Sequence, residues 1–126
     1  MDKYYVKYRD YTGEDYSTEF STLEEAKANI ISEIDIEIKK IINAGLKYKT
    51  IENGTETEIY SPSTDIYYEW KIIKYGDVEV YINWLDKEQE KIPQDLFDVQ
   101  FGKIGIEEME EEVKQDYLNW LDCGVW

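Results

Sequence analysis

Carboxylates are the residues in this sequence whose number and spacing could support chemistry. The 126-residue chain has 29 aspartates and glutamates and no histidine. Paired carboxylates can hydrolyse glycosides or hold Mg²⁺. However, 29 acids form many pairs by chance, and no spacing matches a calcium-binding loop or a glycine-rich phosphate loop. The sequence therefore predicts no metal site and no cofactor.

Nucleophilic catalysis lacks the residues that it needs. Without histidine there is no Ser–His or Cys–His pair to activate a nucleophile. The single cysteine, Cys123, follows Asp122, whose negative charge disfavours a thiolate. Only one arginine, Arg9, is present to clamp an anionic substrate. We therefore expect a protein that is not an enzyme, with a carboxylate-based enzyme as one alternative.

The net charge indicates the kind of partner. The formal charge is −15 near pH 7, and residues 50–126, with nineteen acids and six bases, carry −13 of it. This surplus repels phosphate backbones and anionic membranes, so we expect a basic protein as partner, with no direct nucleic-acid or membrane binding. One cysteine permits no internal disulfide, and the first residues lack the apolar segment of a signal peptide, so we expect a cytoplasmic location.

An acidic run lies near the C-terminal end of the sequence. The apolar residues Ile106, Met109, Val113 and Tyr117 have helical spacing, which predicts a helix from about 106 to 122. Acids three and four apart on such a helix lie about 5–6 Å from one another and would form a row like that of phosphates. A solvated face, with its first-turn acids stabilised by the helix dipole, is the alternative. The candidate partner-binding residues on this helix are Glu107, Glu108, Glu111, Glu112 and Asp116.

Tyrosine alternates with acid on a second candidate surface. In a strand over 55–60, the period-two alternation places Glu56, Glu58 and Tyr60 on one face. Tyrosine supplies a large contact area and one hydrogen bond at low entropic cost, which is typical of interfaces. Simple cover for the second face of a sheet and a homodimer contact are the alternatives. The candidate residues of this surface are Glu56, Glu58, Tyr60 and Tyr67, with Trp126 as a further apolar anchor.

The elements that position these residues begin with two strands and a helix. Period-two alternation predicts strands over 4–9 and 15–20. Ser21 and Glu24 then match a capping box, and the isoleucines that follow have helical spacing up to Asn43. Gly45 is suited to end this helix in the left-handed conformation.

Two hairpins and the helical C-terminal region complete the prediction. Asn53-Gly54 is a strong hairpin signal between strands over 46–51 and 55–60. Gly76-Asp77 predicts a second turn, between strands over 66–75 and 78–84. Pro93 is suited to open a short helix that ends at Val99. The element order predicts one α+β domain over residues 1–126, with a largely antiparallel sheet and its helices on one face.

The size, the net charge and the acidic run Glu107–Glu112 resemble those of small acidic α+β inhibitors encoded by phages and mobile elements. Anti-CRISPR proteins and anti-restriction DNA mimics are examples of this class. The resemblance implies a protein inhibitor that occupies the nucleic-acid or target site of a CRISPR or restriction nuclease and blocks it. An immunity protein that neutralises a nuclease toxin, and a structural or housekeeping domain whose acidity serves solubility, are the alternatives.

Overall fold

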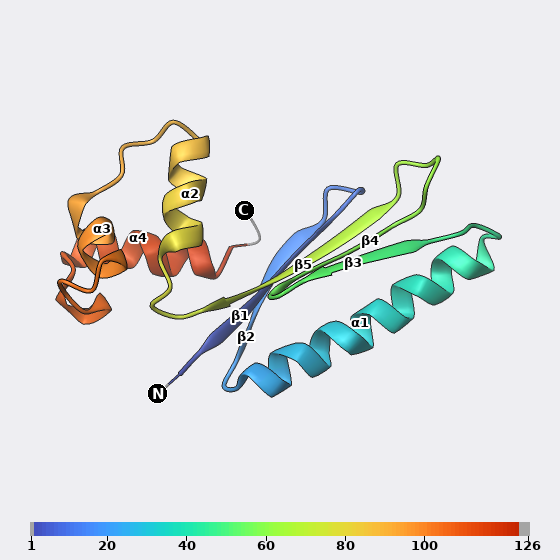
Figure 1. Ribbon diagram of the computed structural model, residues 1–126, viewed down its shortest axis with the longest axis horizontal. Helices are drawn as coiled ribbons and strands as arrows, with labels where there is room; N and C mark the ends of the chain where they lie inside the picture. The colour runs from blue at the N-terminus through green and yellow to red at the C-terminus, as the bar shows by residue number, and fades with distance from the viewer. Residues whose placement is uncertain (1, 124–126) are drawn as a thin grey trace.

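The computed structural model describes residues 2–123 as an α+β fold, in which one long helix lies along an antiparallel sheet and shorter helices gather at one end (Figure 1). The fold class predicted from the sequence is confirmed. The strands are β1 (Tyr4–Asp10), β2 (Asp15–Phe20), β3 (Lys49–Asn53), β4 (Glu56–Tyr60) and β5 (Tyr67–Lys74). The helices are α1 (Leu23–Asn43), α2 (Glu79–Lys87), α3 (Gln94–Gln100), the short 3₁₀ helix η1 (Ile106–Glu108) and α4 (Glu111–Leu121).

The five strands pair in the order β2-β1-β5-β4-β3, and every neighbouring pair is antiparallel. β1 is buried along most of its length, because both of its faces are covered. Val6 and Tyr8 face α1, whereas Tyr5 and Lys7 face the shorter helices on the opposite side. This double burial makes β1 the strand that joins the two cores of the molecule.

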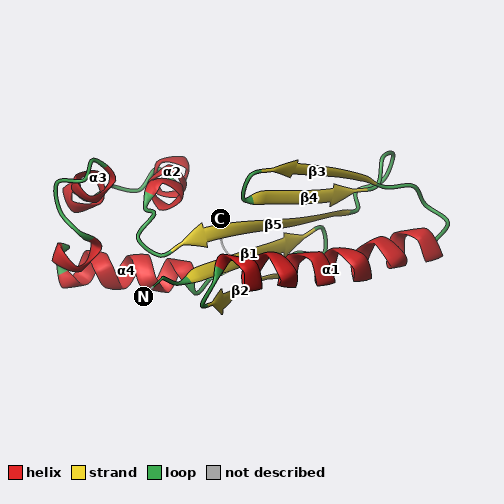
Figure 2. Cartoon of the chain, turned by 60° about the horizontal axis from the view of Figure 1, so that its bottom comes forward, coloured by secondary structure: helices red, strands yellow, loops and turns green. Residues whose placement is uncertain are grey.

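α1 covers one face of the sheet and is anchored there by both apolar and polar contacts (Figure 2). Its cap is Thr22, whose hydroxyl accepts a hydrogen bond from the Glu25 amide at 3.1 Å. The cap predicted from the sequence, Ser21 with Glu24, was therefore one residue too early. Gly45 follows the helix with φ +74°, as predicted.

The hairpin at Asn53-Gly54 is confirmed, with β3 and β4 joined by Gly54 and Thr55. Gly54 has φ +63°, which the turn requires and which glycine adopts without strain. β3 begins only at Lys49 and runs to Asn53, three residues later at its start than the sequence suggested.

The strand predicted over 78–84 is wrong, because this segment begins α2. The alternation of Val78, Val80, Ile82 and Trp84 suggested a strand. However, the residues that become buried are Val78, Tyr81, Ile82 and Leu85, whose spacing of three and four is helical. Both periods are present in the sequence, and the packing of these side chains on α4 selects the helix.

The helix predicted over 106–122 is broken. η1 ends at Glu108, and Met109 and Glu110 are extended, with ψ of 153° and 141°, before α4 begins at Glu111. Met109 is buried in the core of the shorter helices, 5 % exposed, and the Glu110 amide donates to Asp95 at 2.8 Å. The tertiary contacts of these two residues therefore interrupt the helix.

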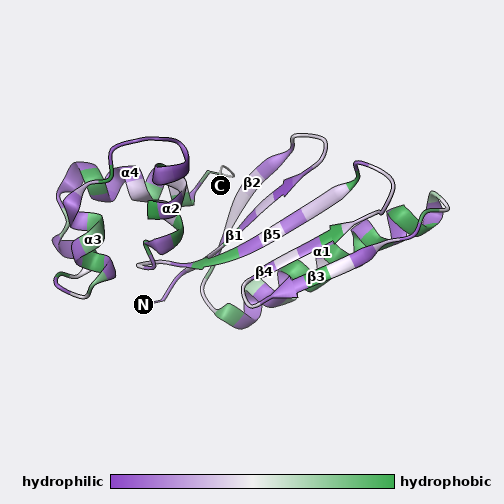
Figure 3. Cartoon of the chain, turned by 45° about the horizontal axis from the view of Figure 1, so that its top comes forward, coloured by the Kyte–Doolittle hydropathy of each residue, from purple (hydrophilic) through white to green (hydrophobic). Residues whose placement is uncertain are grey.

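The shorter helices lie against the face of the sheet that α1 does not cover, at one end only. Their core contains Leu96, Tyr117 and Leu121, and it packs on Tyr5 and Ile73 of the sheet. The sequence had placed all helices on one face, so this arrangement differs from the prediction. Figure 3 shows apolar residues recurring along α1 and a mixture of apolar and polar residues in the shorter helices. None of the helices in the described chain is both long and apolar enough to cross a membrane.

Candidate functional site

A groove with several carboxylates lies between the start of α3 and the first part of α4. We call it the acidic groove. Its lining includes three half-buried apolar side chains, those of Ile92, Pro93 and Val113, which we call its floor. Its other lining residues are Lys91, Gln94, Asp95, Glu110, Glu112 and Asp116.

A hydrogen bond joins the two sides of the acidic groove. Asp95 lies in the first turn of α3, where a negative side chain is favoured by the helix dipole. Its Oδ2 accepts the 2.8 Å hydrogen bond from the Glu110 amide, immediately before α4 begins. On α4, Glu112 and Asp116 are four residues apart and therefore lie on the same side of the helix. The groove thus brings together acids that are 15 to 21 positions apart from Asp95 in the sequence.

The part of the molecule that carries the acidic groove is its most negative part. Residues 77–123 contain fourteen acids and four lysines, a net charge of −10 out of −15 for the whole chain. Glu110, Glu112 and Asp116 are exposed. Carboxylates above an apolar floor can accept hydrogen bonds from arginine or lysine while the floor contacts the aliphatic part of the same side chain. This chemistry suits a basic protein surface.

The predicted residues of the acidic run are only partly brought together. Glu112 and Asp116 line the groove, whereas Glu108 and Glu111 are exposed outside its lining. Because Met109 and Glu110 interrupt the helix, the predicted i,i+4 row from Glu107 to Glu111 does not form, and that interpretation was wrong.

Glu107 is used by the fold itself. It forms an ion pair with Lys114 and accepts a hydrogen bond from the Tyr75 hydroxyl at 2.9 Å. Hydrogen bonds from Lys114 and from Tyr75 hold the pKa of Glu107 below its ordinary value. Glu107 therefore connects η1 to α4 and to the residue that follows β5. Among the five predicted acids, it has the clearest structural role.

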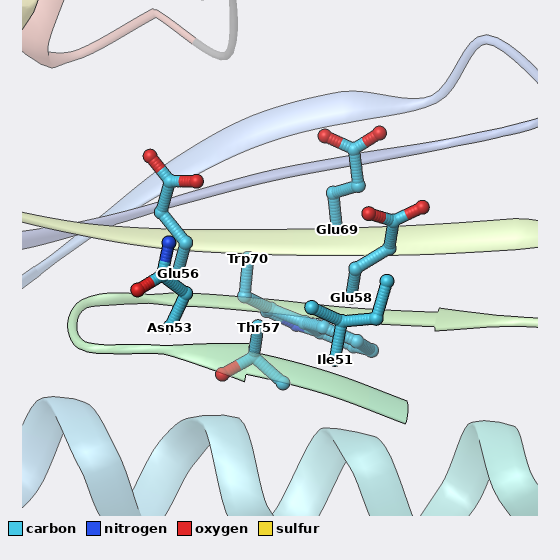
Figure 4. Close-up of a pocket in the computed structure, with 7 residues that line it drawn as sticks. All are labelled: Ile51, Asn53, Glu56, Thr57, Glu58, Glu69 and Trp70. Atoms are coloured by element: carbon cyan, nitrogen blue, oxygen red, sulfur yellow. The ribbon is translucent and has the colours of Figure 1, made fainter. Parts of the chain in front are cut away.

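The second predicted surface lies on the face of the sheet opposite α1. We call it the open face, and it consists of Ile51, Glu56, Glu58, Tyr60, Tyr67 and Glu69. Strand alternation places Glu56, Glu58 and Tyr60 together, as predicted. Figure 4 shows the carboxylates of Glu56, Glu58 and Glu69 pointing away from α1, next to a shallow pocket between β3, β4 and β5. Tyr60 lies directly opposite Tyr67 across the β4–β5 pair.

The open face has mixed charge, unlike the acidic groove. Glu69 forms an ion pair with Arg9, whose Nη2 lies 3.1 Å from Oε2, and Glu56 forms one with Lys71 at 2.9 Å. Glu58 lies opposite Glu69 across the strand pair, a like-charge arrangement that disfavours folding by a few tenths of a kcal/mol to about 1 kcal/mol. The open face is therefore a less negative surface than the sequence suggested. Trp126, the remaining predicted anchor, lies outside the described residues.

Sequence reasoning missed Asp95 as a member of the acidic groove, and it placed Glu110 in the acidic run without naming it as a binding residue. Pro93 correctly indicated the start of α3, which places Asp95 in a first turn. No local signal indicated that this turn packs beside the start of α4. Among residues 2–123, no group of three or more acidic or cysteine side chains is arranged to hold a metal ion.

Comparisons with protein-family models, with curated proteins and with solved structures find no match to this chain. The functional argument therefore depends on the geometry and charge described above.

Proposed function

We propose that this protein is an inhibitor that binds a basic nucleic-acid-handling protein, such as a CRISPR or restriction nuclease, and blocks its nucleic-acid or target site. The acidic groove is the surface that binds. The observation that carries the proposal is the convergence of Asp95, Glu110, Glu112 and Asp116 around an apolar floor, in the region that holds −10 of the net charge.

The chemistry of the groove supports a protein partner. A protein that binds nucleic acid has lysines and arginines at its binding site, and their long side chains have apolar stems. The carboxylates would speed the encounter and set its orientation, and Ile92, Pro93 and Val113 would contact the stems. Bound in this way, the inhibitor would exclude a nucleic acid both by its volume and by its charge.

The test uses two triple variants with the same net charge. The groove variant carries Glu110→Gln, Glu112→Gln and Asp116→Asn, and leaves Asp95 to hold the start of α4. The open-face variant carries Glu56→Gln, Glu58→Gln and Glu69→Gln. Each is compared with the wild type for binding to, and inhibition of DNA cleavage by, a panel of purified RNA-guided and restriction nucleases. Circular dichroism and urea unfolding check that both variants fold.

We expect the wild type to inhibit a member of the panel, with an affinity that falls as ionic strength rises. The groove variant should lose most of this inhibition and the open-face variant should keep it. Loss in the open-face variant alone would place the site on the sheet and contradict the groove as the binding surface. Equal loss in both would show a general charge effect with no local site. No binding to any nuclease would contradict the proposed function itself.

A further inference from the structure

One edge of the sheet is available for pairing with another strand. β3 is the last strand in the order β2-β1-β5-β4-β3, and all five of its residues are exposed. It contains no proline, and its central residue, Ile51, is an apolar side chain that is 48 % exposed. An exposed strand of this kind is a template for a further strand.

The backbone groups that point outward from β3 follow from its pairing with β4. Thr55 accepts a hydrogen bond from the Ile72 amide at 2.9 Å, so the odd-numbered residues of β4 turn their backbone groups toward β5 and the even-numbered ones toward β3. Glu58, opposite Ile51, therefore bonds to β3. The alternation leaves the amide and carbonyl groups of Thr50 and Glu52 directed away from the sheet.

These outward groups fit those of a second copy. In an antiparallel pair of two β3 strands centred on Ile51, Thr50 lies opposite Glu52 of the other copy, and the two residues can exchange both backbone hydrogen bonds. Ile51 then faces Ile51 of the other copy in the closer, non-hydrogen-bonded pair, and Lys49 lies opposite Asn53. All five residues of β3 take part in this pairing, and no two residues of like charge lie directly opposite each other.

The charge distribution favours this edge over the other one. β3 has one lysine and one glutamate and is therefore neutral, in a chain whose net charge is −15. The opposite edge strand, β2, contains Asp15 and Glu19 and no basic residue. The Ser17 hydroxyl of β2 also donates to the Leu121 carbonyl at 2.6 Å, so the end of α4 lies against that edge. Two copies can thus meet at β3 without bringing acidic surfaces together.

We propose that β3 is the contact between two copies of this chain, which pair about a two-fold axis at Ile51 to form a continuous ten-stranded sheet. The axis is perpendicular to the sheet, so the two open faces lie on the same side and adjoin along the new strand pair. The contact is short, and the dimer is therefore concentration-dependent rather than permanent. This inference depends on the fold alone, and its failure would leave the proposed function unaffected.

Sedimentation velocity over a range of protein concentrations tests the dimer, with two disruptive variants and a matched control for each. Thr50→Pro removes an amide that the strand alternation directs away from the sheet, and Thr50→Ala keeps that amide. Ile51→Lys places two positive charges at the two-fold axis. Ile36→Lys makes the same change at an isoleucine of α1 that is 51 % exposed.

The wild type, Thr50→Ala and Ile36→Lys should shift with concentration from 15.1 kDa toward twice that mass. Thr50→Pro and Ile51→Lys should remain monomeric. If Thr50→Pro does not fold, Ile51→Lys still decides the matter. Hydrogen exchange gives a second measurement, since the amides of Thr50 and Glu52 should exchange roughly tenfold more slowly, or slower still, in the dimer. Any of three results would overturn the proposal. The wild type stays monomeric at every concentration, the dimer persists in both disruptive variants, or the amides of Thr50 and Glu52 exchange freely in the dimer.

Discussion

The ammonium nitrogen of Lys7 lies 2.8 Å from the carbonyl oxygen of Trp120 and 3.7 Å from the centroid of its indole ring. The two residues are 113 positions apart in the sequence. Lys7 lies in the middle of β1 and is fully buried, and it also donates to the Cys123 carbonyl at 2.8 Å. The Lys7 amino group thus adds a donor to two carbonyls at the end of α4, of which that of Trp120 also accepts from the Cys123 amide at 3.1 Å. Its charged form opposes the negative end of the helix dipole. The contact holds the helices that carry the acidic groove against the sheet.

Replacing Lys7 by methionine should therefore lower the free energy of unfolding by about 1–3 kcal/mol, because the buried hydrogen bond to the Trp120 carbonyl and the partly buried one to the Cys123 carbonyl are both lost. Methionine is close in length to lysine and limits the change in volume. The measurement is urea unfolding followed by circular dichroism. Lys3→Met is the matched control. Lys3 lies just before β1 and forms an exposed ion pair with Glu19, which should contribute less than about 1 kcal/mol to the free energy of unfolding. Equal effects of the two changes would contradict the structural role of Lys7.

Lys7 should also make stability depend on pH. Burial lowers the pKa of Lys7 from 10.5 to about 7, with Cys123 and Asp15 acting in the opposite direction and Lys71 in the same one. In the unfolded chain the pKa of Lys7 is ordinary. Between about pH 7 and pH 10.5, this side chain therefore binds more protons in the unfolded chain than in the folded one. The free energy of unfolding should then rise with pH, by up to about 1.4 kcal/mol per unit. Urea unfolding between about pH 7.5 and 9.5 should show this rise in the wild type and not in Lys7→Met. The same slope in both proteins would exclude Lys7 as its source.

Asp10 should stabilise the turn between β1 and β2. Its Oδ1 accepts hydrogen bonds from the Thr12 amide at 2.9 Å and the Glu14 amide at 3.3 Å, and its Oδ2 accepts one from the buried Tyr8 hydroxyl. Asp10→Asn replaces one acceptor by a donor and should reduce the free energy of unfolding by about 1–3 kcal/mol at neutral pH. Asp65→Asn, at an exposed loop position, is the control and should have little effect.

The same residue should contribute to sensitivity to acid. Burial raises the pKa of Asp10, but hydrogen bonds from Thr12, Tyr8 and Glu14 outweigh burial and hold the pKa below its ordinary value. Its contribution is thus present above the ordinary carboxyl range and is lost as pH falls through the folded-state value. Unfolding measured below about pH 4 should show a smaller loss of stability for Asp10→Asn than for the wild type. A loss as large as that of the wild type would contradict this assignment.

Glu33 should hold α1 on the sheet. Its carboxylate accepts hydrogen bonds from the Tyr16 hydroxyl at 2.9 Å and from the Trp70 indole, and Trp70 is fully buried. Glu33→Met leaves the Trp70 donor without a partner and should lower the free energy of unfolding by about 1–3 kcal/mol. The tryptophan near-ultraviolet circular dichroism should change as well. Asp35→Met, which removes only an exposed ion pair with Lys39, should change neither measurement substantially.

Several features were predictable because they depend on residues close together in the sequence. The first two strands and the helix after them follow from alternation and helical spacing, and the hairpin after Asn53 follows from a glycine that accepts φ +63°. The shared face of Glu56, Glu58 and Tyr60 follows from strand alternation alone. Each of these features needs only local steric preferences and one consistent hydrophobic period.

The candidate site was less predictable. Glu112 and Asp116 were identified from their position in an acidic run, and both line the acidic groove. Asp95 was not identified, because a single acid in a short helix has no distinguishing pattern. Its place beside Glu110 depends on how α3 packs against the start of α4.

The sequence by itself determined the α+β class, the position of most strands, the surplus of negative charge and the absence of histidine chemistry. These properties depend on composition and on neighbours within a few residues. Only the tertiary structure decided that residues 79–87 form a helix, that Met109 interrupts the last one and that Lys7 is buried. In the first two cases the local pattern allowed two conformations, and in the third it allowed either an exposed or a buried side chain. The choice between them was made by burial against residues distant in the sequence, where a single buried contact outweighs a weak local preference.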